Sequence, residues 1–561
     1  MRNYLKYLLT VLIIIASFSI SVAQDGFYKE SELEIIEYPD ETIYKFKNTG
    51  ELLNGYYKIQ RTTGGYYQSQ FADGKPDGKW ERFNSNNKLI EEFTRKDGVI
   101  NGKAITYHGG TDKISIEKNY TDGKLDGKYI KLGINGNVLE EASYKNGLLN
   151  GEELIFYNDE TIYKKGNYTE GLKNGLFEEY SDKGRLINKK YYKEDKLNGI
   201  EEKYNADGIL MSEIEYKDGL KDGVSLFYSV NTDRIIQREE YAEGKLNGQL
   251  EKYSEDGNLL LKHSYKNGKR DGVFKEYYDN EKLKTEGEYT NGEKTDEWRW
   301  YYQRGPLREI INYANNKKNG VHEYYNEDGV LVSLITYKND IKDGLIKEYD
   351  RASLKLLKEG KMTAGKKNGE WKEYYINGNL KQKGSYIFDK PDGKHERYNE
   401  DGTPRDVITY KAGEKNGATI EYYSNGKIRY KGSYLLNRKT DKWEYYSETG
   451  ELTDKEEYNK DGKPHGTWIE YFPKKTKQVT TYKNGNKTGI TESYYENGNL
   501  KQKGYFTDNL KNGKWTYYYT NGKPARQEEY KNNKLNGEWA EYDEDGQVTE
   551  RRTYKDDVML E

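Results

Sequence analysis

GEWKEYYINGNLKQKGSY, residues 369–386, consists of two short strand-forming segments on either side of a turn signal. The flanking segments EWKEYY and LKQKGSY are rich in residues that favour β-strands. Asn377-Gly378 lies between them and predicts a type I′ turn, in which both central residues have positive φ. Nearly the same string returns at 489–506 as GITESYYENGNLKQKGYF. The stretch therefore predicts a β-hairpin that the chain repeats.

The repeat period is found by stepping along the chain from Tyr386, the aromatic residue that ends the quoted stretch. Later copies of this anchor, each 24 residues further on, are Tyr410, Tyr434, Tyr458, Tyr482, Phe506, Tyr530 and Tyr554. Earlier copies lead back, with small irregularities, to Phe46. Self-similarity at a fixed period is the sign of a repeat architecture, and residues 46–561 would hold about 21 repeats.

Each unit, numbered from its anchor as position zero, repeats the same residue types. Glycine recurs at +3, +7 and +16, a large residue at +9, tyrosine at +12 and +13, and an aliphatic residue at +18. In the quoted unit the repeat-structural residues are Gly369, Trp371, Tyr374, Tyr375, Gly378, Leu380 and the next anchor, Tyr386. The tryptophans at +9 form the candidate binding surface: Trp298, Trp371, Trp443, Trp515 and Trp539.

Strand register follows from the predicted turns. A two-residue turn at +15/+16 pairs +13 with +18, +11 with +20 and +9 with +22. The residues at +9, +13, +18 and the anchor then share one face, and Tyr374 at +12 points to the other. Glutamate recurs at +11 on the first face, in Glu179, Glu276, Glu373, Glu421 and Glu541. These side chains form either a carboxylate ladder for a cationic partner or solvated positions on a half-exposed sheet.

The composition fits a thin, ordered sheet. Hydrophobic residues make up 34% of the chain and charged residues 33%, so a thick aliphatic core is excluded. Aromatic residues reach 14%, which argues against disorder. We therefore expect an all-β fold of tandem ~24-residue hairpin repeats that form one elongated, twisted, single-layer antiparallel sheet.

The N-terminal segment differs from the rest. Arg2 and Lys6 precede an apolar run, and Ser21-Val22-Ala23 supplies the small residues that signal peptidase requires. This pattern predicts a signal peptide over residues 1–23, cleaved after Ala23, although a retained membrane anchor is the alternative. Residues 24–45 would be a lead-in or cap. The expected location is secreted, periplasmic or cell-envelope, with no membrane insertion after cleavage.

The repeated pattern Y-x-x-G-x-x-x-G-x-W-x-x-Y-Y-x-x-G-x-L resembles MORN repeats, with Met362 in the first place of the unit that ends at Leu380. It is most similar to the MORN repeat variant of bacterial proteins known as YwqK-type antitoxins of toxin–antitoxin systems. The resemblance covers roughly residues 46–561. It implies one hairpin per repeat, stacked into a long sheet that serves as an interaction scaffold.

Catalytic and cofactor signals are weak. The chain has no cysteine, its five histidines fall in different repeats, and its glycines follow the turn period. We expect no enzymatic activity, no cofactor and no metal. Acidic and basic residues are interspersed and the net charge is −3, so nucleic acid is not an expected partner.

The pattern favours a non-enzymatic scaffold that binds an unknown protein partner through an extended sheet face. One alternative is a glycan- or peptidoglycan-binding surface in which rows of Trp and Tyr stack on sugars. Another is an antitoxin- or immunity-type inhibitor of a partner protein. Burial of the +9 tryptophans would argue against sugar stacking.

Overall fold

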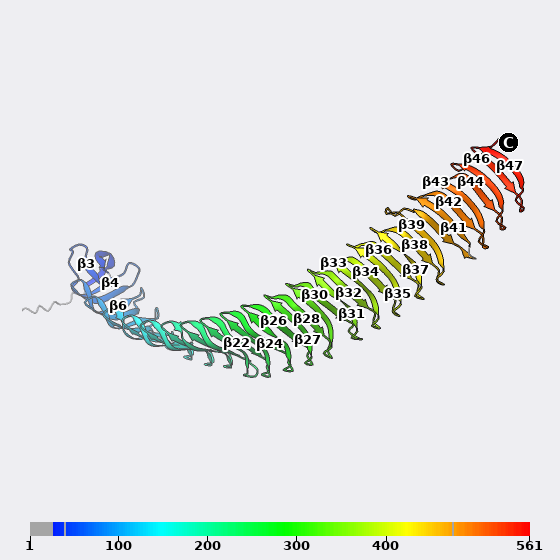
Figure 1. Ribbon diagram of the computed structural model, residues 1–561. Coiled ribbons are helices and arrows are strands. Elements are labelled where there is room, and N and C mark those ends of the chain that lie inside the picture. Colours follow the sequence, from blue (N-terminus) through cyan, green and yellow to red (C-terminus); the bar gives the residue numbers. More distant parts are fainter. Residues whose placement is uncertain (1–25, 39–40, 474–475, 561) are drawn as a thin grey trace, which may run out of the picture. The chain divides into compact units, whose positions relative to one another are not determined.

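The computed structural model describes residues 26–38, 41–473 and 476–560. The predicted signal peptide lies outside these residues. The chain divides into two compact units, Met1–Gly272 and Val273–Glu561. Both are built of β-strands joined by tight turns, and the described residues contain no α-helix (Figure 1). The predicted all-β fold of tandem hairpin repeats is confirmed.

The first unit begins with a small two-layer region. β1 (Gly26–Lys29) pairs in parallel with β4 (Gly55–Gln60), so the sheet is not wholly antiparallel as predicted. The chain between them forms the 3-10 turn η1 (Glu30–Glu32) and a separate hairpin of β2 (Leu33–Glu37) and β3 (Thr42–Phe46). Such a crossover lets the two strands run in the same direction. Leu33 and Tyr44 of this hairpin belong to a buried cluster with Phe71 and Trp80.

The rest of the first unit is an antiparallel meander in which most strands pair with the strands next to them in sequence. Its strands are β5 (Tyr66–Ala72), β6 (Lys75–Phe83), β7 (Leu89–Lys96), β8 (Val99–Tyr107), β9 (Ile114–Thr121), β10 (Lys124–Leu125), β11 (Gly127–Leu132), β12 (Val138–Lys145), β13 (Leu148–Phe156), β14 (Ile162–Thr169), β15 (Leu172–Tyr180), β16 (Leu186–Lys193), β17 (Lys196–Leu197), β18 (Gly199–Tyr204), β19 (Leu210–Lys217), β20 (Leu220–Tyr228), β21 (Ile235–Ala242), β22 (Lys245–Tyr253) and β23 (Leu259–Lys266). The two-residue strands β10 and β17 are bypassed by the pairs β9–β11 and β16–β18. β24 (Lys269–Tyr277) spans the division between the units.

The second unit continues the same alternation of eight- and nine-residue strands. Its strands are β25 (Leu283–Thr290), β26 (Glu293–Tyr301), β27 (Leu307–Ala314), β28 (Lys317–Tyr325), β29 (Leu331–Lys338), β30 (Ile341–Tyr349), β31 (Leu356–Thr363), β32 (Lys366–Tyr374), β33 (Leu380–Ile387), β34 (Lys390–Tyr398), β35 (Pro404–Lys411), β36 (Glu414–Tyr422), β37 (Ile428–Leu435), β38 (Arg438–Tyr446), β39 (Leu452–Tyr458), β40 (Gly466–Tyr471), β41 (Lys477–Lys483), β42 (Asn486–Tyr494), β43 (Leu500–Thr507), β44 (Leu510–Tyr518), β45 (Pro524–Lys531), β46 (Lys534–Tyr542), β47 (Val548–Lys555) and β48 (Val558–Met559).

Strand register agrees with the prediction in the middle of each hairpin. Trp371 at +9 pairs with Gly384 at +22, and Glu373 at +11 pairs with Gln382 at +20. The prediction is wrong at the end of the hairpin. A bulge follows Glu373, so Tyr374 at +12 pairs with Leu380 at +18 and Tyr375 lies in the turn.

The turn at +15/+16 differs from the predicted type I′ turn. At Asn377-Gly378 only the glycine has positive φ, 97°, and the Gly378 N–H donates to the Tyr375 carbonyl at 2.9 Å. This is a three-residue hairpin loop whose glycine forms a bulge. The two-residue turns with positive φ at both residues lie at +2/+3, as in Asn267-Gly268 with φ of 50° and 80°. Asn377 instead uses its side chain, which donates to the Glu400 carbonyl of the next repeat at 2.7 Å.

Candidate functional site

One face of the sheet, here called the tryptophan face, carries the +9 residues, the anchors and the +11 and +20 side chains. Trp371 pairs with Gly360 and Gly384 on the neighbouring strands, and its ring lies over Gly360. A Cβ added to Gly360 would overlap the Trp371 ring. The same relation joins Gly287 to Trp298, Gly432 to Trp443 and Gly504 to Trp515. Glycine two residues before the anchor therefore makes room for tryptophan, a signal present in the sequence that the repeat analysis missed.

The predicted candidate surface is mostly covered. Trp298, Trp443 and Trp515 are each 1% exposed, Trp371 is 5% exposed, and Trp539 is half-buried. The Trp371 indole N–H donates to the Lys361 carbonyl at 2.8 Å. The prediction that the anchor shares this face is confirmed: the Trp443 ring lies 5.0 Å from that of Tyr434. Burial leaves the first four of these tryptophans unable to stack on a sugar ring, which argues against the glycan alternative.

Lysines at +5 cover the aromatic residues of the tryptophan face. The Lys367 ammonium lies 4.6 Å from the centre of the Trp371 ring and 5.0 Å from that of Tyr386. Such placement attracts the cation to the ring faces. The equivalent contacts define a lysine row: Lys173, Lys221, Lys294, Lys318, Lys367, Lys415, Lys439, Lys487 and Lys511. Every member is half-buried.

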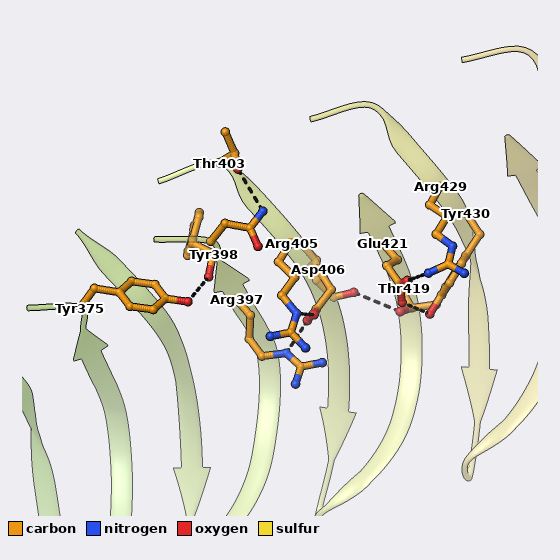
Figure 2. Close-up of polar contacts among 12 residues, drawn as sticks. Tyr375, Arg397, Tyr398, Thr403, Arg405, Asp406, Thr419, Glu421, Arg429 and Tyr430 are labelled. Carbon is orange, nitrogen blue, oxygen red and sulfur yellow. Dashed lines mark hydrogen bonds and ion pairs between the residues drawn. The ribbon is translucent and has the colours of Figure 1, made fainter. Parts of the chain in front are cut away.

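Four of the five +11 glutamates, Glu179, Glu276, Glu373 and Glu421, are paired with basic side chains of the chain. Glu421 accepts hydrogen bonds from Arg429 at 2.8 Å and from the Tyr430 hydroxyl at 2.6 Å, as Figure 2 shows. Glu276 lies 2.8 Å from Lys284. Because these carboxylates already have basic partners, they do not form a free ladder for a cationic ligand.

The opposite face is a ladder of tyrosines and ion pairs. Tyr374 points to this face, as predicted, and its hydroxyl donates to Glu359 at 3.0 Å. Burial, and then this hydrogen bond, raise the pKa of Tyr374 to about 12. In the next repeat the Glu396 carboxylate bonds Lys383 at 2.6 Å, and its bonds to Lys383 and Lys394 hold its pKa at about 2. Charges on this face are therefore largely neutralised by their neighbours.

The hairpin ends are joined from repeat to repeat by tyrosine. The Tyr375 hydroxyl donates to the Tyr398 carbonyl at 2.9 Å (Figure 2). In the same way, the Tyr423 hydroxyl donates to the Tyr446 carbonyl, and the Tyr495 hydroxyl donates to the Tyr518 carbonyl. The +13 tyrosine thus binds the main chain of the following hairpin. Gly369, with φ of 87°, lies at the bulge that begins each hairpin.

One repeat in the second unit lacks both the +5 lysine and the +9 tryptophan of the tryptophan face. Pro391 replaces the +5 lysine and His395 replaces the +9 tryptophan, and both line a hollow of about 150 Å³. Burial lowers the pKa of His395, and its Nε2 donates to the Ser385 carbonyl at 2.7 Å. Arg397 donates through Nε to the buried Asp406 at 2.7 Å (Figure 2).

No group of three or more metal-ligating side chains occurs in the described ranges. Within the same ranges, no helix is long and apolar enough to cross a membrane.

The repeat geometry agrees with a known family. Nine segments match the MORN repeat variant family: residues 197–218, 246–267, 270–291, 318–339, 367–387, 415–435, 487–508, 511–532 and 535–556. These nine segments make up about a third of the chain. They include Trp371, Gly378 and Tyr386 of the quoted stretch.

Comparison of the chain with curated proteins finds no match. Among solved structures, the crystal structure of TcdB2-TccC3-Cdc42 is 11% identical over 89% of this chain and 30% of that one, with a TM-score of 0.13. The Tc holotoxin pore of Photorhabdus luminescens, with a mutation in TccC3, gives the same identity, coverage and TM-score. The chain therefore spans about a third of the length of these structures.

Proposed function

We propose that the protein is a non-enzymatic MORN-repeat scaffold, secreted or periplasmic, that binds another protein along the tryptophan face. The proposal rests mainly on the lysine row. Where the row is unbroken, one ammonium recurs per repeat of two strands, so charges are spaced by about two strand separations, ~10 Å. A regular row of this kind suits a partner that presents several carboxylates.

The two faces differ in how much charge they leave available. Lysines on the opposite face, such as Lys383 and Lys503, are paired with glutamates. Among the described residues, Lys415 and Lys511 of the lysine row make no ion pair and contact only aromatic rings. Their ammonium groups can bind a partner's carboxylates without first breaking an ion pair, which favours the tryptophan face.

The test is a pull-down from a native cell-envelope extract with residues 24–561 as bait. We expect a protein partner, identified by mass spectrometry, whose recovery falls with added salt. The variant Lys415→Gln with Lys511→Gln should lower recovery several-fold. The matched control, Lys442→Gln with Lys514→Gln, removes the same charge from exposed lysines elsewhere and should bind normally. Recovery of glycan fragments alone, or equal loss in both variants, would overturn the proposal.

A further inference from the structure

One edge of the second unit carries a row of unusual turns. The first residue of each two-residue turn has φ near +50°. In most repeats of this unit that residue is polar: Asn291, Asn315, Asn339, Asn484, Asp508, Asn532 and Asp556. Four consecutive repeats depart from this rule and place Ala364, Phe388, Ala412 and Leu436 there, with φ between 47° and 52°. These four turns join β31 to β32, β33 to β34, β35 to β36 and β37 to β38.

The apolar residues are unfavourable at this position on two counts. Asparagine and aspartate tolerate positive φ because their short polar side chains bond locally, whereas bulky apolar residues do not. Phe388 is also 50% exposed and Leu436 is 55% exposed, so packing within the unit does not offset the backbone strain. Strained backbone and exposed apolar surface together mark a site of interaction.

The four turns, or tips, alternate in the size of their first side chain. Phe388-Asp389 and Leu436-Asn437 are large tips, and Ala364-Gly365 and Ala412-Gly413 are small ones. All four lie on the same edge, since every turn of this kind joins the second strand of one repeat to the first strand of the next. Neighbouring tips are therefore about 10 Å apart.

We propose that this edge, the apolar tip row, associates with the same edge of a second copy of the chain. A two-fold axis between the two central tips reverses their order in the partner copy. The Phe388 tip then faces an Ala412 tip, and the Leu436 tip faces an Ala364 tip, so each large residue meets a small one. A two-fold interface must be self-complementary in this way.

The charges balance within each central tip, but the two-fold axis sets Lys390 opposite Lys411 of the partner copy, so association should strengthen with added salt. The central tips each carry one acidic and one basic residue, Asp389 with Lys390 and Glu414 with Lys411. Exposed Ile387, 50% accessible, extends the apolar surface. The row is only about 30 Å long, which is small beside a standard protein interface, so association should be weak and dependent on concentration.

Sedimentation velocity over a range of concentrations tests the proposal. The natural chain should shift from monomer to dimer as concentration rises. Phe388→Asn with Leu436→Asn should stay monomeric and unfold at a higher temperature, because asparagine is the residue that neighbouring turns use at this φ. The matched control is Ile376→Asn, which removes an apolar side chain of 55% exposure from the opposite edge and should still dimerise. A monomeric natural chain at every concentration, or an Asn double variant that dimerises equally, would overturn the proposal.

Cysteine cross-linking tests the orientation independently, since the chain has no cysteine of its own. In the proposed dimer Lys390 of one copy faces Lys411 of the other. A mixture of Lys390→Cys and Lys411→Cys chains should form a disulfide-linked pair under mild oxidation. A mixture of Lys390→Cys and Lys366→Cys should not, because those two tips are far apart. The opposite pattern would rule out the two-fold arrangement.

Discussion

At the scale of the residue, the tryptophan face depends on pairs in which a large residue on one strand packs against a small residue on the next. Most of the large +9 rings in the second unit occupy space that a glycine on the adjacent strand leaves open, as Gly504 does for Trp515. Trp515 is 1% exposed although the sheet has no thick core around it. Burial here comes from a close fit within one face, with a lysine stem laid over the ring.

Replacing the small partner should therefore destabilise the fold. Gly504→Ala places a methyl group against the Trp515 ring and should cost about 1–3 kcal/mol of unfolding free energy, measured by urea denaturation. Adding Trp515→Thr should remove most of that cost, because Gly504 already pairs with Thr491 on its other side. Additive effects of the two substitutions would contradict the close-fit explanation.

The sequence predicts Trp371 and Tyr386 on one face because strand parity alone decides that. It does not single out Gly360, which makes room for the Trp371 ring, because one more glycine in a glycine-rich repeat resembles an ordinary weak strand position. The lysine row is hidden for a similar reason. Lys367 is one lysine among many, and only the register shows that its ammonium lies over Trp371.

At the scale of the element, each hairpin end is held to the next by a side chain rather than by the sheet. The Tyr375 hydroxyl supplies a hydrogen bond to the main chain at a point where the ladder ends. Tyr375→Phe removes only that bond and should lower stability by about 1 kcal/mol. Thermal unfolding compares it with Tyr505→Phe, a tyrosine that is 44% exposed and should show no change.

The tyrosine–glutamate ladder of the opposite face predicts a pH dependence. Burial, and then bonds to Glu202 and Glu286, raise the pKa values of Tyr204 and Tyr301 to about 12. The phenol therefore stays neutral to a higher pH in the folded protein than in the unfolded chain, where tyrosines have pKa values near 10. This stability is fully present below pH 10 and is lost as the pH rises towards 12. Tyrosinate absorbance should rise late in the folded protein and at lower pH in urea; coincident curves would contradict the prediction.

Turn chemistry could be predicted only in part. Asn377-Gly378 correctly marks a hairpin, but the dipeptide suits both a two-residue turn and a three-residue loop. Which of the two turns forms depends on the next repeat, because its Glu400 carbonyl accepts a hydrogen bond from the Asn377 side chain. A contact of that kind lies between repeats and is absent from any local pattern.

At the scale of the whole molecule, strands in each unit pair with their sequence neighbours, so a repeat depends mainly on the repeats beside it. Deleting residues 483–506, one full period, should leave a folded protein with unchanged tryptophan fluorescence. Deleting residues 483–505 shifts the following strand by one residue and exchanges its faces. Circular dichroism and fluorescence should separate the two deletions, and equal behaviour would contradict strict register.

The same strand-by-strand pairing has a mechanical consequence. A force that pulls the first and last strands of the second unit apart loads the hydrogen bonds of one strand pair at a time. Each repeat would then peel away at low force, releasing 24 residues, or about 80 Å of extended chain. A single-molecule force–extension trace would show a series of equal steps rather than one sudden rupture, so the unit would lengthen gradually under load.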